Sequence, residues 1–373
     1  MSDDTLTMLA DAAAAFAQPD AKRVRRLRGT QRSFETAVWR RMADQGWLSV
    51  LVPEVRGGLG LGQDAAAVIA QRIGYACLPE PYVAAGVMTT TLLAACEETP
   101  ALARLRGEVV SGERIVVAAW QNDEGALAPV LTNITAREHG VDIVLDGSCR
   151  FVRVASADAF IVAARGDAGL ALYCVGRDRA GLTITAESAA DGSANARLVL
   201  AGVRVGAADR LAGHDRAQAA LDTAIEAAVL TTSAELVGIM ERVLELTFEY
   251  LRTRKQFGKP IGSFQALQHR AVDIWIQKEL SKAALAASLA RFDAPGATAR
   301  ERSLAASSAK ARAAEAAMLV CKQAVQLHGA IGYTDEYDLS LYFNRALVLC
   351  AWLGNGAAQR RRYGELTRGE GQA

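Results

Sequence analysis

The spacing of hydrophobic and polar positions changes twice along the chain. Residues 1–112 and 211–373 place apolar side chains three or four positions apart, which is the spacing of one helix face. Between them, residues 113–210 form short runs of alternating apolar and polar positions, separated by glycine-containing turns. The pattern predicts three domains with these bounds.

The order of these helical and alternating patterns along the chain also predicts the fold. Strands that follow one another closely, with no helix between them, are typical of an antiparallel barrel or sandwich. The chain lacks the βαβ alternation of a doubly wound nucleotide-binding fold. We therefore expect an α fold with a small β domain: an N-terminal helical bundle, a central antiparallel β barrel or sandwich, and a C-terminal bundle of long helices.

Composition narrows the class of protein. The chain has 373 residues, of which 51% are hydrophobic, so it has ample material for a buried core. Its 42 Lys and Arg against 41 Asp and Glu argue against a broad basic face for nucleic acid. No run approaches the roughly 18 uninterrupted apolar residues of a membrane-spanning helix, and the first residues lack the pattern of a signal peptide. We expect a cytoplasmic protein without a nucleic-acid or membrane partner.

Cysteine and histidine give no sign of a metal site. The six cysteines are scattered and include no CxxC pair, and none of the four histidines lies within ligand spacing of another. In a chain of this length, such cysteines are expected to be reduced and mostly buried. We expect no bound metal.

Two segments near the ends of long helices carry candidate chemistry. Residues 252–268 combine several cations, a phenylalanine and glutamines around a Gly/Pro turn that leads into a new helix, where an anion would be favoured. Residues 326–337 end a helix in a glycine-rich turn that a flat or phosphorylated ligand could approach closely. Taken singly, the first segment is better explained as a charged helix C-terminus with a Gly/Pro turn. The second segment could also be a C-cap followed by a loop.

Taken together, the two segments resemble the acyl-CoA dehydrogenase family. The first reads Arg-x-x-Phe-Gly from Arg254, followed by Phe-Gln-x-x-Gln from Phe264, and the second reads Gln-x-x-Gly from Gln326. The residues 52–60 and 78–81 are similar to that family too, and the domain order fits over nearly the whole chain. The resemblance implies a flavoprotein that oxidises an acyl-CoA thioester to the trans-2-enoyl-CoA and passes electrons to an electron-transfer flavoprotein. In the family, a glutamate removes the α-proton while the β-hydride moves to the flavin.

The resemblance also implies which residues meet the cofactor. In this family FAD lies between subunits, and these two segments reach across to a neighbour's flavin. Arg254 would meet the FAD pyrophosphate, and Gln265 with the Gln326–Ala330 turn would meet the adenosine half. Ala330 stands where many members have a second glycine. The expected cofactor-binding residues are Arg254, Phe257, Gln265, Gln326, Gly329 and Ala330.

Other family features are absent. Residues 118–125 stand where members have a Thr-Glu-x-x-x-Gly-Ser-Asp-like loop, and Arg153 stands where members have a threonine that contacts the flavin ring. The position of the catalytic glutamate is occupied by Leu353 or Asn355, depending on the anchor used for counting. The alternative position on the preceding long helix is Ala228. Glu226 is two residues away, about 200° around a helix, and should point elsewhere.

These departures form a pattern. Residues that would act on a neighbour's flavin are kept, and those that would serve the chain's own flavin and proton transfer are missing. The chain therefore resembles the smaller, non-catalytic subunit of the heterotetrameric acyl-CoA dehydrogenases of bacterial steroid side-chain and related lipid catabolism. It would pair with a homologous catalytic subunit in a tetramer and share FAD across the interface.

One alternative is a self-sufficient homo-oligomeric flavoenzyme, either a dehydrogenase or an oxygenase with Arg153 as an electrostatic group. The other is a flavin-free scaffold.

Overall fold

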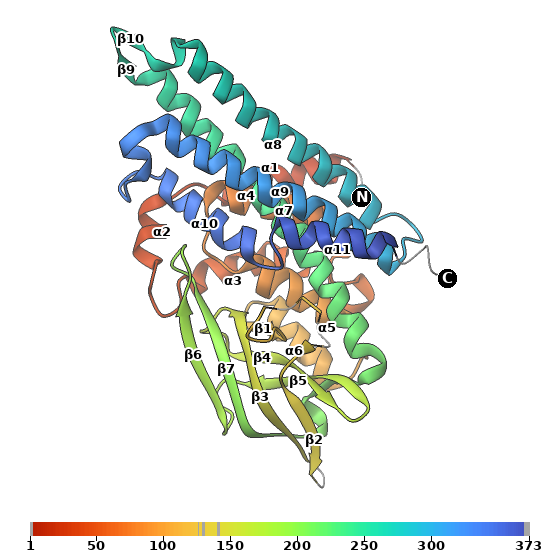
Figure 1. The fold of residues 1–373 in the computed structure, drawn as a ribbon. Coiled ribbons are helices and arrows are strands. Elements are labelled where there is room, and N and C mark those ends of the chain that lie inside the picture. Colours follow the sequence, from red (N-terminus) through yellow and green to blue (C-terminus); the bar gives the residue numbers. More distant parts are fainter. Residues whose placement is uncertain (1–2, 126, 129–130, 140–141, 369–373) are drawn as a thin grey trace. The chain divides into compact units, whose positions relative to one another are not determined.

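The computed structural model describes residues 3–125, 127–128, 131–139 and 142–368 (Figure 1). The chain folds as two compact units that do not follow sequence order. The helical unit comprises Met1–Arg26, Gln63–Leu78 and Val229–Ala373, and the β-containing unit comprises Leu27–Gly62 and Pro79–Ala228. The division into residues 1–112, 113–210 and 211–373 stays a prediction.

Long helices build the helical unit. They are α1 (Asp3–Phe16), most of α2 (Ala21–Leu27), α4 (Gln63–Ala76), the second part of α7 (His214–Thr253), α8 (Gln265–Phe292), α9 (Ala299–His328), α10 (Leu339–Ala351) and α11 (Gly356–Arg368). A capping box starts α9, because the Thr298 hydroxyl accepts from the Glu301 N–H at 3.2 Å and the Glu301 carboxylate accepts from the Thr298 N–H at 2.8 Å. The expected C-terminal bundle of long helices is confirmed.

The β-containing unit joins a mixed sheet to short helices. Its helices are α3 (Thr36–Asp44), η1 (Trp47–Ser49), η2 (Glu54–Arg56), the π-helix η3 (Tyr82–Met88), α5 (Thr89–Ala95), α6 (Pro100–Val110), η5 (Ala207–Asp209) and the first part of α7. Its strands are β1 (Val116–Ala119), β2 (Thr135–His139), β3 (Asp142–Arg153), β4 (Ala159–Gly166), β5 (Gly169–Gly176), β6 (Leu182–Ser188), β7 (Ala194–Val205) and β8 (Arg210–Ala212). All of these strands begin within the predicted β span, and β8 continues just past its end.

The strand order in the sheet is β6-β7-β3-β2-β4-β5-β8, with β1 beside β4. Most neighbouring strands are antiparallel, as the sequence predicts, and β3 pairs with β7 over nearly its full length. Strand β1 instead runs parallel to β4, with Val116 opposite Ala159, and β2 meets β4 in parallel at one position. The alternating pattern of a strand carries no information on its direction, so the sequence did not show this mixture.

Helix α7 is the core helix of the protein. Among the described helices it alone is long and apolar enough by composition to cross a bilayer, and 94% of its most apolar window is buried inside the protein. The six cysteines are free thiols, and five of them are buried. Burial raises the pKa of the Cys149 thiol to about 12, so this side chain behaves as a small hydrophobe.

Candidate cofactor-binding site

The hairpin that follows α7 presents an aromatic ring to solvent. Strands β9 (Lys255–Gln256) and β10 (Lys259–Pro260) pair antiparallel, with Phe257 and Gly258 as the turn at φ of 53° and 80°. Two successive positive φ values are typical of a type I′ turn, which matches the twist of the flanking strands. The turn leaves Phe257 91% exposed, in edge-to-face contact with Phe264 at 6.0 Å between ring centroids. A large exposed aromatic held by such a turn is suited to contact another molecule.

Positive charge gathers around this hairpin. Arg252, Arg254, Lys255 and Lys259 are exposed, and no Asp or Glu lies between Glu249 and Asp273 in the sequence. The hairpin leads through a 3-10 turn (η6, Ile261–Ser263) into the N-terminus of the long helix α8, whose dipole adds positive potential. Gln265 is exposed at the first position of α8. The local chemistry favours an anion such as a pyrophosphate.

The end of α9 forms the second part of the site. Gly329 follows the helix with φ of 67° and ψ of −143°, and the chain continues in the 3-10 turn η7 (Gly329–Tyr333). Gln326, Gly329 and Ala330 are exposed, and Tyr333 is 85% exposed. A polar amide and accessible backbone therefore lie together at this turn. The Gln326 amide and the exposed backbone groups can donate hydrogen bonds to, and accept them from, a ligand that lies flat on this turn.

The β9–β10 hairpin and the end of α9 lie at the same end of the helical unit (Figure 1). An aromatic cluster joins the helix ends that carry them. Tyr250 in the last turn of α7 stacks on His328 in the last turn of α9, with 4.6 Å between ring centroids. Tyr337 packs against both rings, and its hydroxyl lies 3.2 Å from His328 Nε2. Because of these contacts, the predicted cofactor-binding residues of both segments are exposed at one end of the unit. Their roles stay predictions.

We expect this cluster to weaken in mild acid. Burial lowers the pKa of His328, whose Nδ1 lies 2.7 Å from the Ala324 carbonyl oxygen. Since the unfolded chain binds the proton near pH 6.5 and the folded chain only at lower pH, the contribution to stability is present above about pH 6.5 and is lost as the pH falls below it. Thermal unfolding against pH, for the parent chain and His328→Phe, measures this. The stability advantage of the parent should shrink below about pH 6.5, and an advantage independent of pH would contradict the assignment.

The turn between α10 and α11 holds the positions expected for a catalytic glutamate. Leu353 is buried with φ of 57°, and Asn355 is the exposed N-cap of α11, whose Oδ1 accepts from the Ala358 N–H at 2.9 Å. The buried ammonium of Lys310 donates to four backbone oxygens here, those of Leu349, Cys350, Trp352 and Gly354, at 2.8–3.4 Å. The Lys310 ammonium thus holds the turn in place through its backbone oxygens. Neither candidate position, Leu353 or Asn355, carries a carboxylate. Lys310 is not among the residues predicted from the sequence, because a lysine in a helical pattern gives no sign of burial.

The alternative base position is also without an acid. Ala228 is fully buried in α7, and the nearby Glu226 is 4% exposed. The Glu226 carboxylate is buried in α7, whereas the two predicted cofactor-binding segments are exposed.

Among residues 3–125, 127–128, 131–139 and 142–368, no group of three His, Cys, Asp or Glu side chains is placed to hold a metal ion.

In the β-containing unit, the segment around Arg153 is irregular. The β3–β7 register shifts between Cys149 and Val152, and Phe151 and Val154 have φ of 58° and 65°. For a β-branched residue such as Val154 this conformation is strained. Arg153 Nη1 donates to Asn195 Oδ1 on β7 at 3.1 Å. A long cation that is hydrogen-bonded to the neighbouring strand does not fit a position where a flavin ring would contact a small hydroxyl group. In the helical unit, the exposed cations and the exposed turn after α9 fit the phosphates and the adenosine half of a dinucleotide.

Comparison with known proteins identifies relatives over nearly the full length. The model of the acyl-CoA dehydrogenase N-terminal domain matches residues 3–100, and that of the acyl-CoA dehydrogenase C-terminal domain matches residues 218–366. Acyl-CoA dehydrogenase FadE27 of Mycobacterium tuberculosis is 32% identical over 348 residues, which cover 91% of this chain and 90% of that protein. Acyl-CoA dehydrogenase IpdE2 of the same organism is 30% identical over 325 residues, 87% of this chain and 84% of that protein.

Solved structures show the same fold. A chain of the ChsE4–ChsE5 complex from Mycobacterium tuberculosis superposes with a TM-score of 0.87 at 28% identity, covering 100% of this chain and 99% of that one. A chain from a variant of the Tcur3481–Tcur3483 steroid ACAD gives a TM-score of 0.87 at 27% identity, covering 99% of both. Glutaryl-CoA dehydrogenase from Mycobacterium smegmatis in complex with FADH2 shares the fold, with a TM-score of 0.88 at 17% identity over 99% of this chain and 95% of that one.

Proposed function

The chain belongs to the acyl-CoA dehydrogenase family, and from this premise we propose that it is the non-catalytic subunit of a flavoprotein complex. It would complete the FAD site of a homologous catalytic chain that dehydrogenates an acyl-CoA thioester. The single observation that carries the proposal is an asymmetry. The cationic hairpin and the α9 turn are kept and exposed, whereas no acid stands at Leu353, Asn355 or Ala228.

Each retained residue would hold one part of the neighbour's cofactor. The Arg254 guanidinium would bind the pyrophosphate, with the N-terminus of α8 adding to the positive potential. The Phe257 ring, exposed on its turn, would cover the cofactor and exclude water from it. Gln265, Gln326 and the Gly329–Ala330 backbone would hydrogen-bond and orient the adenosine half. Bound FAD supplies the hydride acceptor, and these residues supply binding and orientation.

The partner would supply what this chain lacks. It would carry the carboxylate base and the ring side of the flavin pocket, because Arg153 is engaged with Asn195 in this chain. Relatives solved as a two-component complex and as a steroid enzyme support a heteromeric assembly and a lipid or steroid-derived acyl-CoA as substrate class. An electron-transfer flavoprotein would reoxidise the reduced complex.

Reconstitution tests the proposal. We expect the purified chain to be inactive with acyl-CoA thioesters and an electron acceptor. When it is mixed with a catalytic homologue that alone binds FAD weakly, we expect dehydrogenase activity to appear. Activity of the chain alone would contradict the proposal and favour the self-sufficient enzyme. Rapid reoxidation by oxygen would then indicate an oxygenase. An active complex that is indifferent to the hairpin residues would favour the scaffold.

A further inference from the structure

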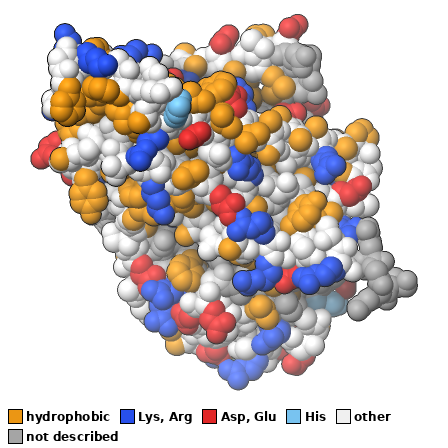
Figure 2. All heavy atoms as spheres, turned by 45° about the horizontal axis from the view of Figure 1, so that its top comes forward, with side chains coloured by type: hydrophobic (Ala, Val, Ile, Leu, Met, Phe, Trp, Pro, Cys, Tyr) orange, Lys and Arg blue, Asp and Glu red, His pale blue; other side chains and the backbone are white. Residues whose placement is uncertain are grey.

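Lys310 is a lysine of α9 that lies fully inside the protein. On the face drawn in Figure 2, Lys and Arg side chains stand at the surface, whereas Lys310 is 0% exposed. Lysine is almost never fully buried, because an ammonium taken out of water loses a large hydration free energy unless protein groups replace the water. The groups around Nζ must therefore compensate for the lost water.

Backbone oxygens replace the hydration shell of this ammonium. Nζ lies 2.9 Å from the carbonyl oxygen of Leu349, 3.4 Å from that of Cys350, 2.8 Å from that of Trp352 and 3.1 Å from that of Gly354. An ammonium has three N–H donors, so these oxygens satisfy all of them. In the part of the chain that the structure describes, Lys310 forms no ion pair with an Asp or Glu side chain. We name the four oxygens the carbonyl cage.

The path of the chain from α10 to α11 forms the carbonyl cage. Leu349 and Cys350 lie in the last turn of α10, where carbonyl oxygens lack helical N–H partners and the helix dipole is negative. In the turn that follows, Leu353 and Gly354 have φ of 57° and 85°. A positive φ is strained for leucine, so contacts with the surroundings must hold it. One such contact is the fully buried Gln359, whose Nε2 donates to the Leu353 carbonyl oxygen at 2.6 Å.

The chemistry of the carbonyl cage suits a cation with a single charge. Rings of backbone carbonyl oxygens replace the hydration shell of K+ in the selectivity filters of channels. Divalent cations instead take carboxylate oxygens among their ligands, and the four oxygens here are all backbone groups. The lysine ammonium carries one charge, as K+ and the free ammonium ion do. Each of these three cations can therefore satisfy the same oxygens.

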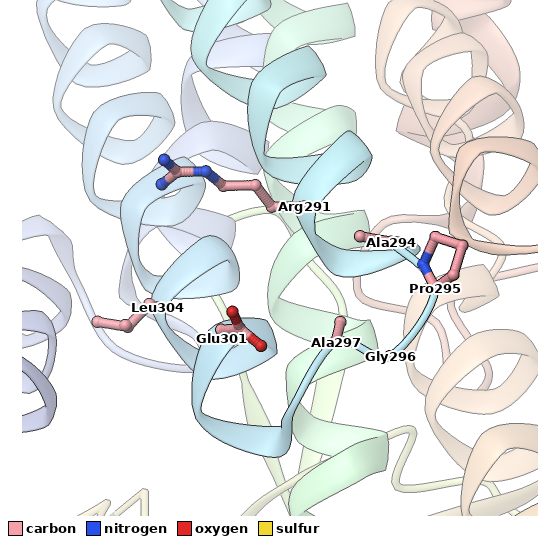
Figure 3. A pocket seen from close by; sticks show the side chains of 7 residues that line it. All are labelled: Arg291, Ala294, Pro295, Gly296, Ala297, Glu301 and Leu304. Atoms are coloured by element: carbon pink, nitrogen blue, oxygen red, sulfur yellow. The ribbon is translucent and has the colours of Figure 1, made fainter.

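An exposed cation of the same unit provides the contrast. The Arg291 side chain, near the end of α8, extends away from the loop at Ala294 and Pro295 beside an open hollow (Figure 3). It is exposed, so water solvates its charge and no protein oxygens are needed for that purpose. Arg291 is therefore a matched reference for the loss of a cation at the surface.

We propose that the α10–α11 turn is a monovalent-cation site and that the ammonium of Lys310 occupies it as a tethered cation. The positive charge holds the carbonyl cage together, since the four oxygens repel one another in the core when no cation lies between them. When the Lys310 side chain is shortened, the cage is left open for K+ or a free ammonium ion. The site includes no flavin-binding residue, so the proposal is independent of the proposed function.

Two variants separate the charge of Lys310 from its size. Lys310→Met removes the charge but fills the carbonyl cage, and Lys310→Ala empties it. In both variants the amide hydrogens of Trp352 and Gln359, which form backbone hydrogen bonds at the two ends of the turn, should exchange at least about tenfold faster than in the parent chain. Hydrogen–deuterium exchange read by mass spectrometry measures this. Arg291→Ala, the control, should leave the exchange unchanged. Parent-like protection of the turn in Lys310→Met would overturn the proposal.

Added cations test the site itself. In Lys310→Ala, KCl or NH4Cl should slow exchange at the turn at least about fivefold relative to the same concentration of tetramethylammonium chloride, whose cation is too large for the carbonyl cage. If this variant folds poorly, the same two salts should restore its folding selectively.

The parent chain and Lys310→Met are the controls for the added cations, because a side chain already fills the cage in each. Both should respond equally to all three salts. If Lys310→Ala also responds equally, folded or not, the cation site is wrong. None of these measurements depends on flavin content, so failure here leaves the proposed function to its own test.

Discussion

Replacing Arg254 by alanine should release FAD from the complex of this chain with its catalytic partner. The side chain is exposed in the segment between α7 and α8, and no Asp or Glu lies between Glu249 and Asp273 to compete for it. Loss of a charge-assisted hydrogen bond to a pyrophosphate costs about 2–3 kcal/mol, which corresponds to a roughly 30- to 150-fold rise in the dissociation constant for FAD. Flavin fluorescence during dilution of the complex measures this constant directly.

Arg252→Ala is the matched control for Arg254→Ala. Arg252 is an exposed cation in the last turn of α7, two residues earlier and outside the family motif. Its loss lowers the same local potential without removing the proposed contact, so FAD affinity should change by less than about threefold. Equal effects of the two substitutions would mean that only general charge matters. No effect of Arg254→Ala in an intact complex would favour the scaffold hypothesis.

Removing one side of the Glu235–Arg345 pair should cause the largest loss of stability in the helical unit. Arg345 on α10 donates from Nε and Nη2 to Glu235 Oε1 on α7, at 2.9 and 2.7 Å. Their side chains are 9% and 2% exposed. Arg345→Ala leaves a carboxylate buried without its cation, and such a change costs about 3–5 kcal/mol. Urea unfolding followed by helix circular dichroism measures the loss.

The double substitution Glu235→Leu with Arg345→Met separates the contribution of the ion pair to stability from the contribution of the packing around it. Because desolvation of two charges offsets much of their attraction, an apolar pair of similar volume should recover most of the stability lost in Arg345→Ala. Arg40→Ala, at an exposed arginine of α3, provides a reference for loss of an arginine at the surface and should change the free energy of unfolding by less than about 0.5 kcal/mol. A similarly small effect of Arg345→Ala would show that this ion pair contributes little.

The sequence predicted the order of elements because periodicity reports local structure. The return of helical spacing near residue 211 corresponds to α7, which begins at His214, and the alternating runs correspond to strands from Val116 onward. The motifs from Arg254 and Gln326 were found because glycine, aromatic and cationic residues at fixed spacing leave a trace in the sequence itself. The structure places both motifs on exposed segments at one end of the helical unit, where they can serve a ligand.

The remaining features depend on contacts between distant residues. The direction of β1 against β4, the stacking of Tyr250 on His328 and the burial of Lys310 beneath the α10–α11 turn each join segments that are far apart in sequence. The compact units are discontinuous for the same reason, since α4 belongs to a unit whose other helices lie mostly near the C-terminus. Helix and strand periods alone do not encode such pairings.

Flavin content per chain tests the central claim most directly. The chain should be purified alone and, separately, co-expressed with a homologous catalytic subunit, and FAD should be released by denaturation and quantified against total protein. We expect little or no FAD in the chain alone and one FAD for each pair of unlike chains in the complex. A yellow homo-oligomer with one FAD in every copy of this chain would contradict it.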